Sequence, residues 1–255
     1  MIPTMEKDII KAVAAGELVD KRSEMHTAGH WPVRKKEDVL GACVHQNAGG
    51  TDPHITALYH TSPDNHITPG RPLPSICYHV AVVDEEVPWL VADPLWRTYA
   101  QGSPQPGDEN THLLAILVMG NFDGPGHKGK VAMPTLRQLR AFDKAVAWAQ
   151  RTFGFGDSGL FGHYHFGKAA CPGYTLQEQI EARRKVAPDL KTDLEWQQAL
   201  LRWNPTCLPK YGADGDWGDE SKRAVTSFQV AHRIQVTGLR DPFTELLLLK
   251  SYPAV

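Results

Sequence analysis

The sequence predicts an α/β (α+β) protein, in which helices flank a mixed central β-sheet and a second, small three-helix C-terminal domain follows. Short runs of apolar and β-branched residues alternate with helical patterns over residues 1–186, which is typical of a layered sheet-and-helix domain. Residues 193–255 show helical patterning alone. The chain has 255 residues, of which 42% are hydrophobic and 22% charged, enough for one full domain and a small second one.

The strands and short helices of the first domain can be read from local patterns. Runs rich in β-branched, aromatic or apolar residues predict strands, and amphipathic or compact runs between loops predict short helices. The predicted strands are VLGACVH (39–45), SICYHVAVV (75–83), PWLVAD (88–93) and LLAILVMGNF (113–122), and the predicted helices are EKDIIKAVAA (6–15) and PHITALYH (53–60).

Two longer helices and a helical tail complete the expected fold. The stripe of apolar residues over 134–153 predicts a helix, which Thr135 and Gln138 start as a capping box. A second helix is expected from about 176 to 186, with Thr175 and Glu178 as its capping box. APDLKTD (187–193) is interpreted as a linker, after which helices are expected at 194–203 and 219–233.

Charge and composition exclude several classes of function. The formal net charge of −2 gives no general attraction to nucleic acid or to an anionic membrane. No run of 18 apolar residues is present, and the charged N-terminus lacks the apolar core of a secretory signal, so neither a membrane span nor a signal peptide is expected. The four cysteines are expected to be reduced thiols or a metal ligand.

The segment GHYHFGKAACPG (162–173) concentrates potential metal ligands. His163 and Cys171 are eight positions apart, with glycine in the loop between them and Pro-Gly after them, so both side chains can turn to one point. A catalytic zinc site uses three protein ligands and leaves a fourth position to water. His45, at the end of a predicted strand, is the expected third ligand, and His165 is kept as an alternative.

A zinc ion bound to one thiolate and two imidazoles would make water easier to deprotonate. Tyr78 and Lys168 are the candidate groups that could donate to an oxyanion when a carbonyl is attacked. Taken singly, each of these residues has an ordinary structural interpretation, such as a solvated histidine, a buried thiol or a loop lysine. The hypothesis of a hydrolytic metal site therefore depends on their combination.

Five segments, in the same order, resemble the zinc-dependent N-acetylmuramoyl-L-alanine amidases of type 2. They are VLGACVHQNAGG, PSICYHVAV, ILVMGNF, PTLRQLRAF and GHYHFGKAACPG, which together cover roughly residues 38–175. This family includes phage lysozyme-type amidases and shares its fold with peptidoglycan recognition proteins. The resemblance implies cleavage of the amide between N-acetylmuramic acid and the L-alanine of the stem peptide.

The resemblance also assigns roles to residues. It implies zinc ligation by His45, His163 and Cys171, a tyrosine beside the zinc water at Tyr78, and an oxyanion-stabilising lysine at Lys168. Lys168 stands three residues before the cysteine, whereas the family pattern has the lysine two before it. Some relatives carry a glutamate where this chain has Ile116, so Tyr78 is expected to be the polar partner. The sequence also suggests Trp96, Tyr99 and the loop 62–74 as walls of a substrate groove.

The tail resembles the small helical peptidoglycan-binding domain. The turn DGDWG (214–218) and the pattern of Ala224, Val225, Phe228 and Gln229 carry this likeness, and these residues are expected to be structural. Such a domain implies tethering to the wall polymer, which raises the local concentration of the catalytic site. The expected organisation is an N-terminal extension at 1–37, a zinc amidase domain at 38–186, a linker at 187–193 and a peptidoglycan-binding domain at 194–255.

The resulting hypothesis is a monomeric phage endolysin that hydrolyses peptidoglycan and stays in the host bacterial cytoplasm until it is released to the wall. A cytoplasmic amidase that recycles muropeptides is one alternative, against which the wall-tethering tail argues. A non-catalytic peptidoglycan-binding protein is another, against which the complete ligand set argues. A general metallopeptidase is disfavoured because the sequence has no H-E-x-x-H helix.

Overall fold

A six-stranded sheet forms the centre of the computed structural model, which describes residues 4–101, 109–122, 133–184, 190, 192–232, 234 and 236–252. The strand order is β1-β4-β3-β5-β2-β6. All neighbouring strands are parallel except β3 and β4, so the sheet is mixed, as predicted. The strands are β1 (Val19–Asp20), β2 (Gly41–Gln46), β3 (Val80–Val82), β4 (Trp89–Leu90), β5 (Leu113–Val118) and β6 (Leu160–Gly162).

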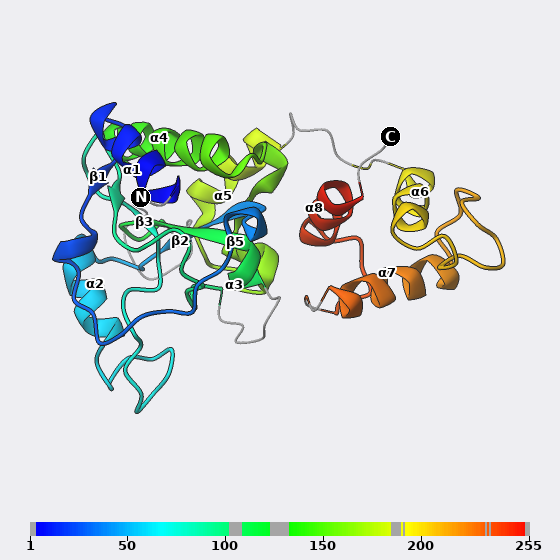
Figure 1. Cartoon of the computed structure of the whole chain (residues 1–255), viewed down its shortest axis with the longest axis horizontal. Helices are drawn as coiled ribbons and strands as arrows, with labels where there is room; N and C mark the ends of the chain where they lie inside the picture. Colours follow the sequence, from blue (N-terminus) through cyan, green and yellow to red (C-terminus); the bar gives the residue numbers. More distant parts are fainter. Residues whose placement is uncertain are drawn as a thin grey trace.

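Helices surround this sheet, and three more lie beyond it (Figure 1). Those of the sheet region are α1 (Thr4–Ala14), α2 (Pro53–His60), α3 (Glu109–His112), α4 (Leu136–Phe153) and α5 (Tyr174–Arg184). Those beyond it are α6 (Asp193–Trp203), α7 (Asp219–Ala231) and α8 (Pro242–Ser251). Short 3₁₀ helices are η1 (Arg22–Glu24), η2 (Lys36–Asp38), η3 (Asp157–Gly159) and η4 (His163–Phe166). No described helix is both long and apolar enough to span a membrane.

The two faces of the sheet have different partners because successive side chains of a strand point to opposite sides. Ala42 and Val44 of β2 belong to the apolar cluster that includes the buried residues of α4. Cys43, between them, belongs to a different cluster that it shares with the C-terminal helices. His45 has the same parity as Cys43, so it lies on the face opposite α4.

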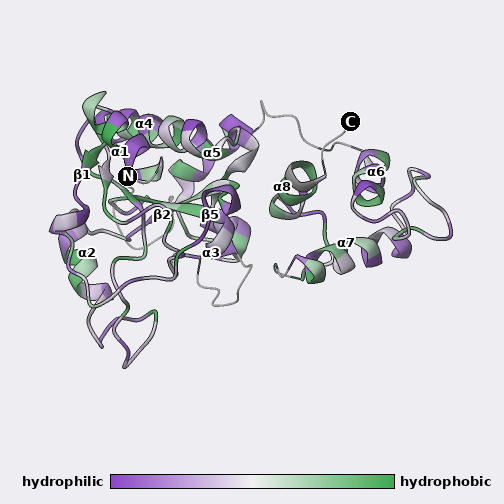
Figure 2. Ribbon diagram, viewed as in Figure 1, coloured by the Kyte–Doolittle hydropathy of each residue, from purple (hydrophilic) through white to green (hydrophobic). Residues whose placement is uncertain are grey.

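The long helix α4 forms as the sequence predicts. The hydroxyl of Thr135 accepts a hydrogen bond from the backbone N–H of Gln138, and the Gln138 side chain accepts one from the Thr135 N–H. Gly154 ends the helix in the left-handed conformation, with φ of 73°. Hydrophilic and hydrophobic residues alternate along α4 (Figure 2), and the apolar stripe is buried against the sheet.

The capping box expected at Thr175 and Glu178 is wrong. The helix begins earlier, at Tyr174, and the N–H of Gln177 already bonds to the carbonyl of Gly173. Thr175 therefore lies inside the first turn, where its buried hydroxyl has no hydrogen-bond partner among the described residues. The expected linker at 187–193 lies largely outside the described residues.

The strand expected over 75–83 is much shorter, and its regular ladder begins only at Val80. The cause is His79, whose imidazole Nδ1 accepts a hydrogen bond from the N–H of Ala115 on β5, at 2.9 Å. The backbone N–H of His79 donates to the backbone carbonyl of Ala115, at 3.0 Å. The His79 side chain thus takes the place of a backbone carbonyl as the acceptor for β5. Tyr78 therefore lies before β3 and not within it.

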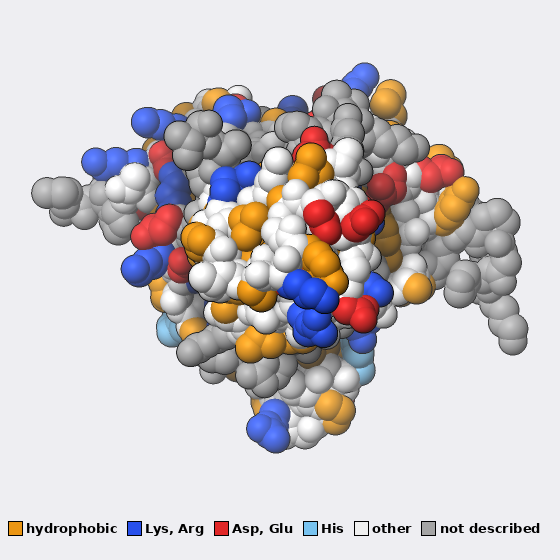
Figure 3. Space-filling model, turned by 90° about the vertical axis from the view of Figure 1, so that its right-hand side faces the viewer, with side chains coloured by type: hydrophobic (Ala, Val, Ile, Leu, Met, Phe, Trp, Pro, Cys, Tyr) orange, Lys and Arg blue, Asp and Glu red, His pale blue; other side chains and the backbone are white. Residues whose placement is uncertain are grey.

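The three C-terminal helices pack around their own apolar centre and also against the sheet region. Phe243, at the start of α8, lies 5.9 Å from the ring of Phe161 on β6 and 5.7 Å from that of Phe166 in η4. The same cluster includes Trp196 and Phe228. On the side turned away from the sheet, acidic, basic and apolar side chains are mixed (Figure 3).

Candidate metal centre

Three potential metal ligands converge on the face of the sheet opposite α4. His45, His163 and Cys171 each offer a ligand atom, and these atoms all lie within 4.8 Å of one another. The two imidazole rings are 4.5 Å apart between centroids. Sγ of Cys171 lies 3.9 Å from Nδ1 of His45. Both histidines are buried and Cys171 is partly exposed, so the group is open to solvent on the cysteine side.

Rigid elements hold the two histidines. His45 is the fifth residue of β2, paired with Leu117 of the neighbouring parallel strand. His163 follows directly after β6, the other neighbour of β2. Parallel strands end at the same edge of a sheet, where ligand sites of open α/β sheets are found. The topology therefore brings residues far apart in sequence to one point.

The loop that carries Cys171 is fixed from both sides. The Gln46 side chain donates to the carbonyl of Ala170 and accepts from the N–H of Phe122. Gly173, with φ of 95°, approaches Phe122 so closely that a Cβ there would lie 2.5 Å from the Phe122 carbonyl carbon. Only glycine fits at this position, which explains the Pro-Gly end of the quoted segment.

The electrostatics of the two histidines favour metal binding. Burial lowers the pKa of His45 well below its ordinary value, and the nearby His163 and His79 lower it further. Burial likewise lowers the pKa of His163 to about 4. Both imidazoles are therefore neutral at pH 7, which is the state that ligates metals.

The residues present fit a zinc ion. Nε2 of His163 is buried and has no hydrogen-bond partner among the described residues, although such groups are nearly always satisfied. Two imidazoles and one thiolate form a donor set that zinc accepts, and three protein ligands leave a position for water or substrate. A bound zinc ion would satisfy the unpartnered nitrogen of His163.

Tyr78 lies beside this cluster. Its ring centroid is 5.2 Å from that of His45 and 5.7 Å from that of His60. Burial is the main cause that raises the pKa of the Tyr78 phenol, and neighbouring thiols contribute to the shift. The hydroxyl therefore keeps its proton at neutral pH and can act as a hydrogen-bond donor.

Lys168 and His165 lie in the same segment but in different surroundings. Lys168 is exposed, and its charge contributes to the lowered pKa of His163. Its carbonyl accepts a hydrogen bond from the N–H of Cys171. His165 instead turns toward α5, where its Nε2 lies 3.4 Å from a carboxylate oxygen of Glu181.

A hollow of about 260 Å³ adjoins Tyr78 and opens along α2. Its walls include Asn47, Asp52, Tyr59 and His66, the last of which belongs to the loop 62–74. Trp96 instead borders a separate hollow with Asp20, Arg22 and Asp93. Tyr99 stacks on Trp31 at 5.8 Å. Of the expected groove walls, the structure thus places the loop 62–74 beside Tyr78.

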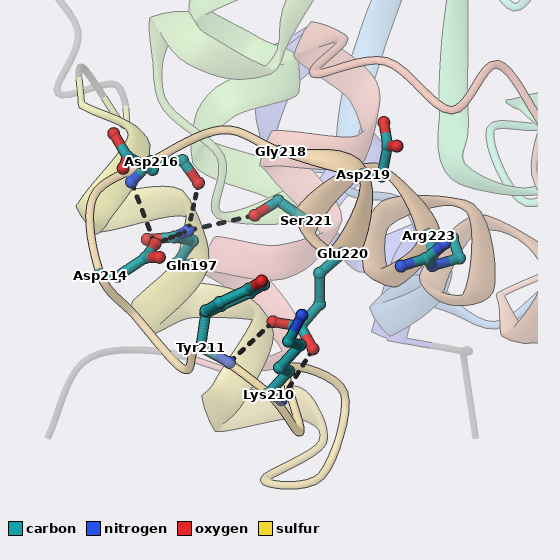
Figure 4. Close-up of a pocket in the computed structure, with 10 residues that line it drawn as sticks. All are labelled: Gln197, Lys210, Tyr211, Asp214, Asp216, Gly218, Asp219, Glu220, Ser221 and Arg223. Carbon is teal, nitrogen blue, oxygen red and sulfur yellow. Dashed lines mark hydrogen bonds between the residues drawn. The ribbon is translucent and has the colours of Figure 1, made fainter.

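A further hollow of about 440 Å³ lies in the C-terminal helices, between the 210–218 turn and the start of α7 (Figure 4). Gln197 of α6 is its centre: its amide nitrogen donates to Asp214, to the carbonyl of Asp216 and to Ser221. The Glu220 carboxylate points to the backbone nitrogens of Lys210 and Tyr211. The bonds of Gln197 hold the DGDWG turn, and those of Glu220 hold the residues just before it.

Two glutamines at the centre were not found from the sequence. Gln46 holds the cysteine loop, and the Gln101 side-chain nitrogen lies 3.5 Å from Nε2 of His45. Gln46 directly follows a candidate ligand, which is a weak signal. Gln101 stands in a polar stretch between two predicted strands, where no pattern distinguishes one residue from its neighbours.

Comparison with known proteins gives matches to cell-wall amidases and their relatives. No family profile matches the chain. A stretch of 41 residues, 16% of the chain, is 51% identical to a probable N-acetylmuramoyl-L-alanine amidase of Bacillus licheniformis. That stretch corresponds to 12% of the curated relative's length, so the match spans only a small part of that protein.

Several solved structures are also similar. The endolysin N-acetylmuramoyl-L-alanine amidase LysCS of Clostridium intestinale has a TM-score of 0.46 and 17% identity, over 67% of this chain and 96% of that one. The Drosophila peptidoglycan recognition protein SD has a TM-score of 0.49 and 17% identity, over 64% and 93%. A human recognition protein in complex with glycosamyl muramyl pentapeptide has a TM-score of 0.48 and 18% identity, over 65% and 94%.

Proposed function

We propose that this chain is a zinc-dependent N-acetylmuramoyl-L-alanine amidase that cleaves peptidoglycan. The observation that carries the proposal is the convergence of His45, His163 and Cys171 beside Tyr78, whose side chain also borders a hollow. The local 51% identity to a probable amidase supports the same reaction. The bond to be broken is the amide between N-acetylmuramic acid and the L-alanine of the stem peptide.

The chain's own residues would bind the metal and stabilise charge. His45, His163 and Cys171 would hold the zinc ion, which would act as a Lewis acid and make water a stronger nucleophile. The Tyr78 hydroxyl, which stays protonated, would donate a hydrogen bond to the oxygen of the attacked carbonyl as negative charge develops there. The exposed Lys168 would add its positive charge at the same side, near His163.

The remaining parts of the chain would deliver this site to its polymer. Helices α6, α7 and α8 would bind the wall and raise the local concentration of the catalytic site. The extension before residue 38 packs through α1 onto the sheet. We propose that the protein acts as a monomeric endolysin, held in the host cytoplasm until it reaches the wall.

The proposal is tested by digestion of purified peptidoglycan. We expect new N-terminal alanine and no new reducing sugar ends, with Cys171→Ser inactive under the same conditions. New reducing ends would show that a glycosidic bond is cleaved instead. Binding to the wall without any cleavage, by protein shown to hold zinc, would leave a non-catalytic peptidoglycan-binding protein.

A further inference from the structure

Gln101 contacts both candidate histidine ligands, one through its side chain and the other through its backbone. Its amide Nε2 lies 3.5 Å from Nε2 of His45. Its backbone lies against the imidazole of His163. Gln101 is 6% exposed.

The backbone of Gln101 is itself anchored. Its N–H donates to Oδ1 of Asn110, at 2.9 Å. Asn110 is almost fully buried, and its carbonyl accepts from the buried guanidinium of Arg34. The position of Gln101 is therefore set by the sheet region and not by solvent.

The ligand geometry fixes which nitrogen of each histidine would carry a proton. Nδ1 of His45 faces the sulfur of Cys171, so with a metal at that nitrogen the ring hydrogen lies on Nε2. Nε2 of His163 lies in the cluster without a hydrogen-bond partner among the described residues. With a metal at that nitrogen the ring hydrogen lies on Nδ1, where a backbone carbonyl can accept it. A neutral imidazole that ligates through one nitrogen donates from the other.

The same argument decides how the amide of Gln101 lies when the metal is bound. With hydrogen on Nε2 of His45, an amide nitrogen at 3.5 Å would place two donors against each other. Oε1 of Gln101 is buried and has no hydrogen-bond partner within the described part of the chain in the present orientation. Rotation of the amide by 180° brings this oxygen to His45 as an acceptor at no cost in shape.

We propose that Gln101 is the positioning residue of the metal centre, orienting His45 through its side-chain oxygen and His163 through its backbone carbonyl. This inference depends on the zinc site of the proposed function. It assigns Gln101 no contact with substrate. Its effect is to hold the ring orientation of both histidines and, once its amide oxygen faces His45, the tautomer that leaves Nδ1 of His45 to the metal.

The test is the zinc affinity of the full chain, measured by competition with a chromophoric chelator. Gln101→Ala removes the acceptor and is expected to weaken zinc binding about 10–100-fold. Gln101→Glu keeps an acceptor for the ring hydrogen and is expected to stay within about threefold of the wild type. Gln138→Ala, an equally buried glutamine that donates to the carbonyl of Met119, controls for loss of stability and is expected to bind zinc normally.

A second measurement does not depend on any variant's folding. In zinc-loaded wild-type protein labelled with ¹⁵N, we expect hydrogen on Nε2 of His45 and on Nδ1 of His163. The inference is overturned if the tautomers are reversed, if Gln101→Ala binds zinc like the wild type, or if Gln101→Glu loses as much affinity as Gln101→Ala. Zinc affinity that depends on Gln101 in a protein without amidase activity would defeat the proposed function and leave this inference standing.

Discussion

The sulfur of Cys171 lies 3.9 Å from Nδ1 of His45, although 126 positions of sequence separate the two residues. The distance is set by the parallel pairing of β2 with β6 and by the loop that Gln46 ties to Ala170. This relationship underlies the predictions below.

Removal of the Tyr78 hydroxyl tests its role as a hydrogen-bond donor. We predict that Tyr78→Phe lowers kcat about 100-fold, the usual effect of losing one donor to a developing oxyanion. The ring stays, so its packing beside His45 and the zinc content are expected to be unchanged. Rates on a soluble muramyl peptide, with zinc measured in the same samples, check this. An unchanged rate would assign Tyr78 a packing role only.

Lys168 is expected to contribute charge and not stability. Because its side chain is exposed, Lys168→Ala is predicted to leave the free energy of unfolding within about 0.5 kcal/mol of the wild type. The hydrolysis rate is expected to fall about tenfold or more. Lys7→Ala, an exposed lysine of α1, is the matched control. Equal rates for the two variants would show that the one-residue offset from the family pattern removes Lys168 from the reaction.

Local sequence signals predict part of the fold and of the candidate metal centre. His45 lies at the end of a predicted apolar strand, and the capping box at Thr135 marks the start of α4. The start of α5 could not be predicted because the carbonyl of Gly173 already accepts a helical hydrogen bond from the N–H of Gln177. The helix therefore begins before Thr175, which the sequence pattern suggested as the cap. Gln101 could not be predicted because only the tertiary fold brings its loop to His45.

Buried neutral histidines make the folded state sensitive to acid. Burial lowers the pKa of His60 to about 4 and that of His79 to about 3, where the nearby Arg34 also contributes. The unfolded chain binds protons near pH 6.5, so it holds more protons than the folded chain below that pH. Stability is therefore complete above about pH 6.5 and falls as the pH drops toward 4.

Each of these histidines is predicted to cost about 1.4 kcal/mol per pH unit inside that window. Urea midpoints between pH 7.5 and 4.5 measure the loss. His60→Gln is expected to be less stable at pH 7 but to show a shallower dependence on pH. The same slope in wild type and variant would contradict the assignment, and the exposed His30→Gln serves as the comparison.

The contact between α8 and the sheet region is expected to join the two parts into one folding unit. Phe243 is 3% exposed and packs on Phe161 and Phe166. Phe243→Ala is predicted to lower the free energy of unfolding by about 3–5 kcal/mol. It is also expected to split the urea transition in two. Leu239→Ala, at a residue that is 66% exposed, is the control. If Phe243→Ala lowers the free energy of unfolding no more than Leu239→Ala does, the docking of α8 on the sheet region is refuted.

The measurement that tests the central claim most directly is the zinc content of the wild-type chain and of four variants after dialysis against a weak chelator. We predict about one zinc per wild-type chain, none in His45→Ala, His163→Ala or Cys171→Ser, and full zinc in His165→Ala, whose ring faces Glu181. Release of alanine from peptidoglycan is expected to follow the zinc content. Full zinc in Cys171→Ser, or none in the wild type, would contradict a metal centre built from these three residues.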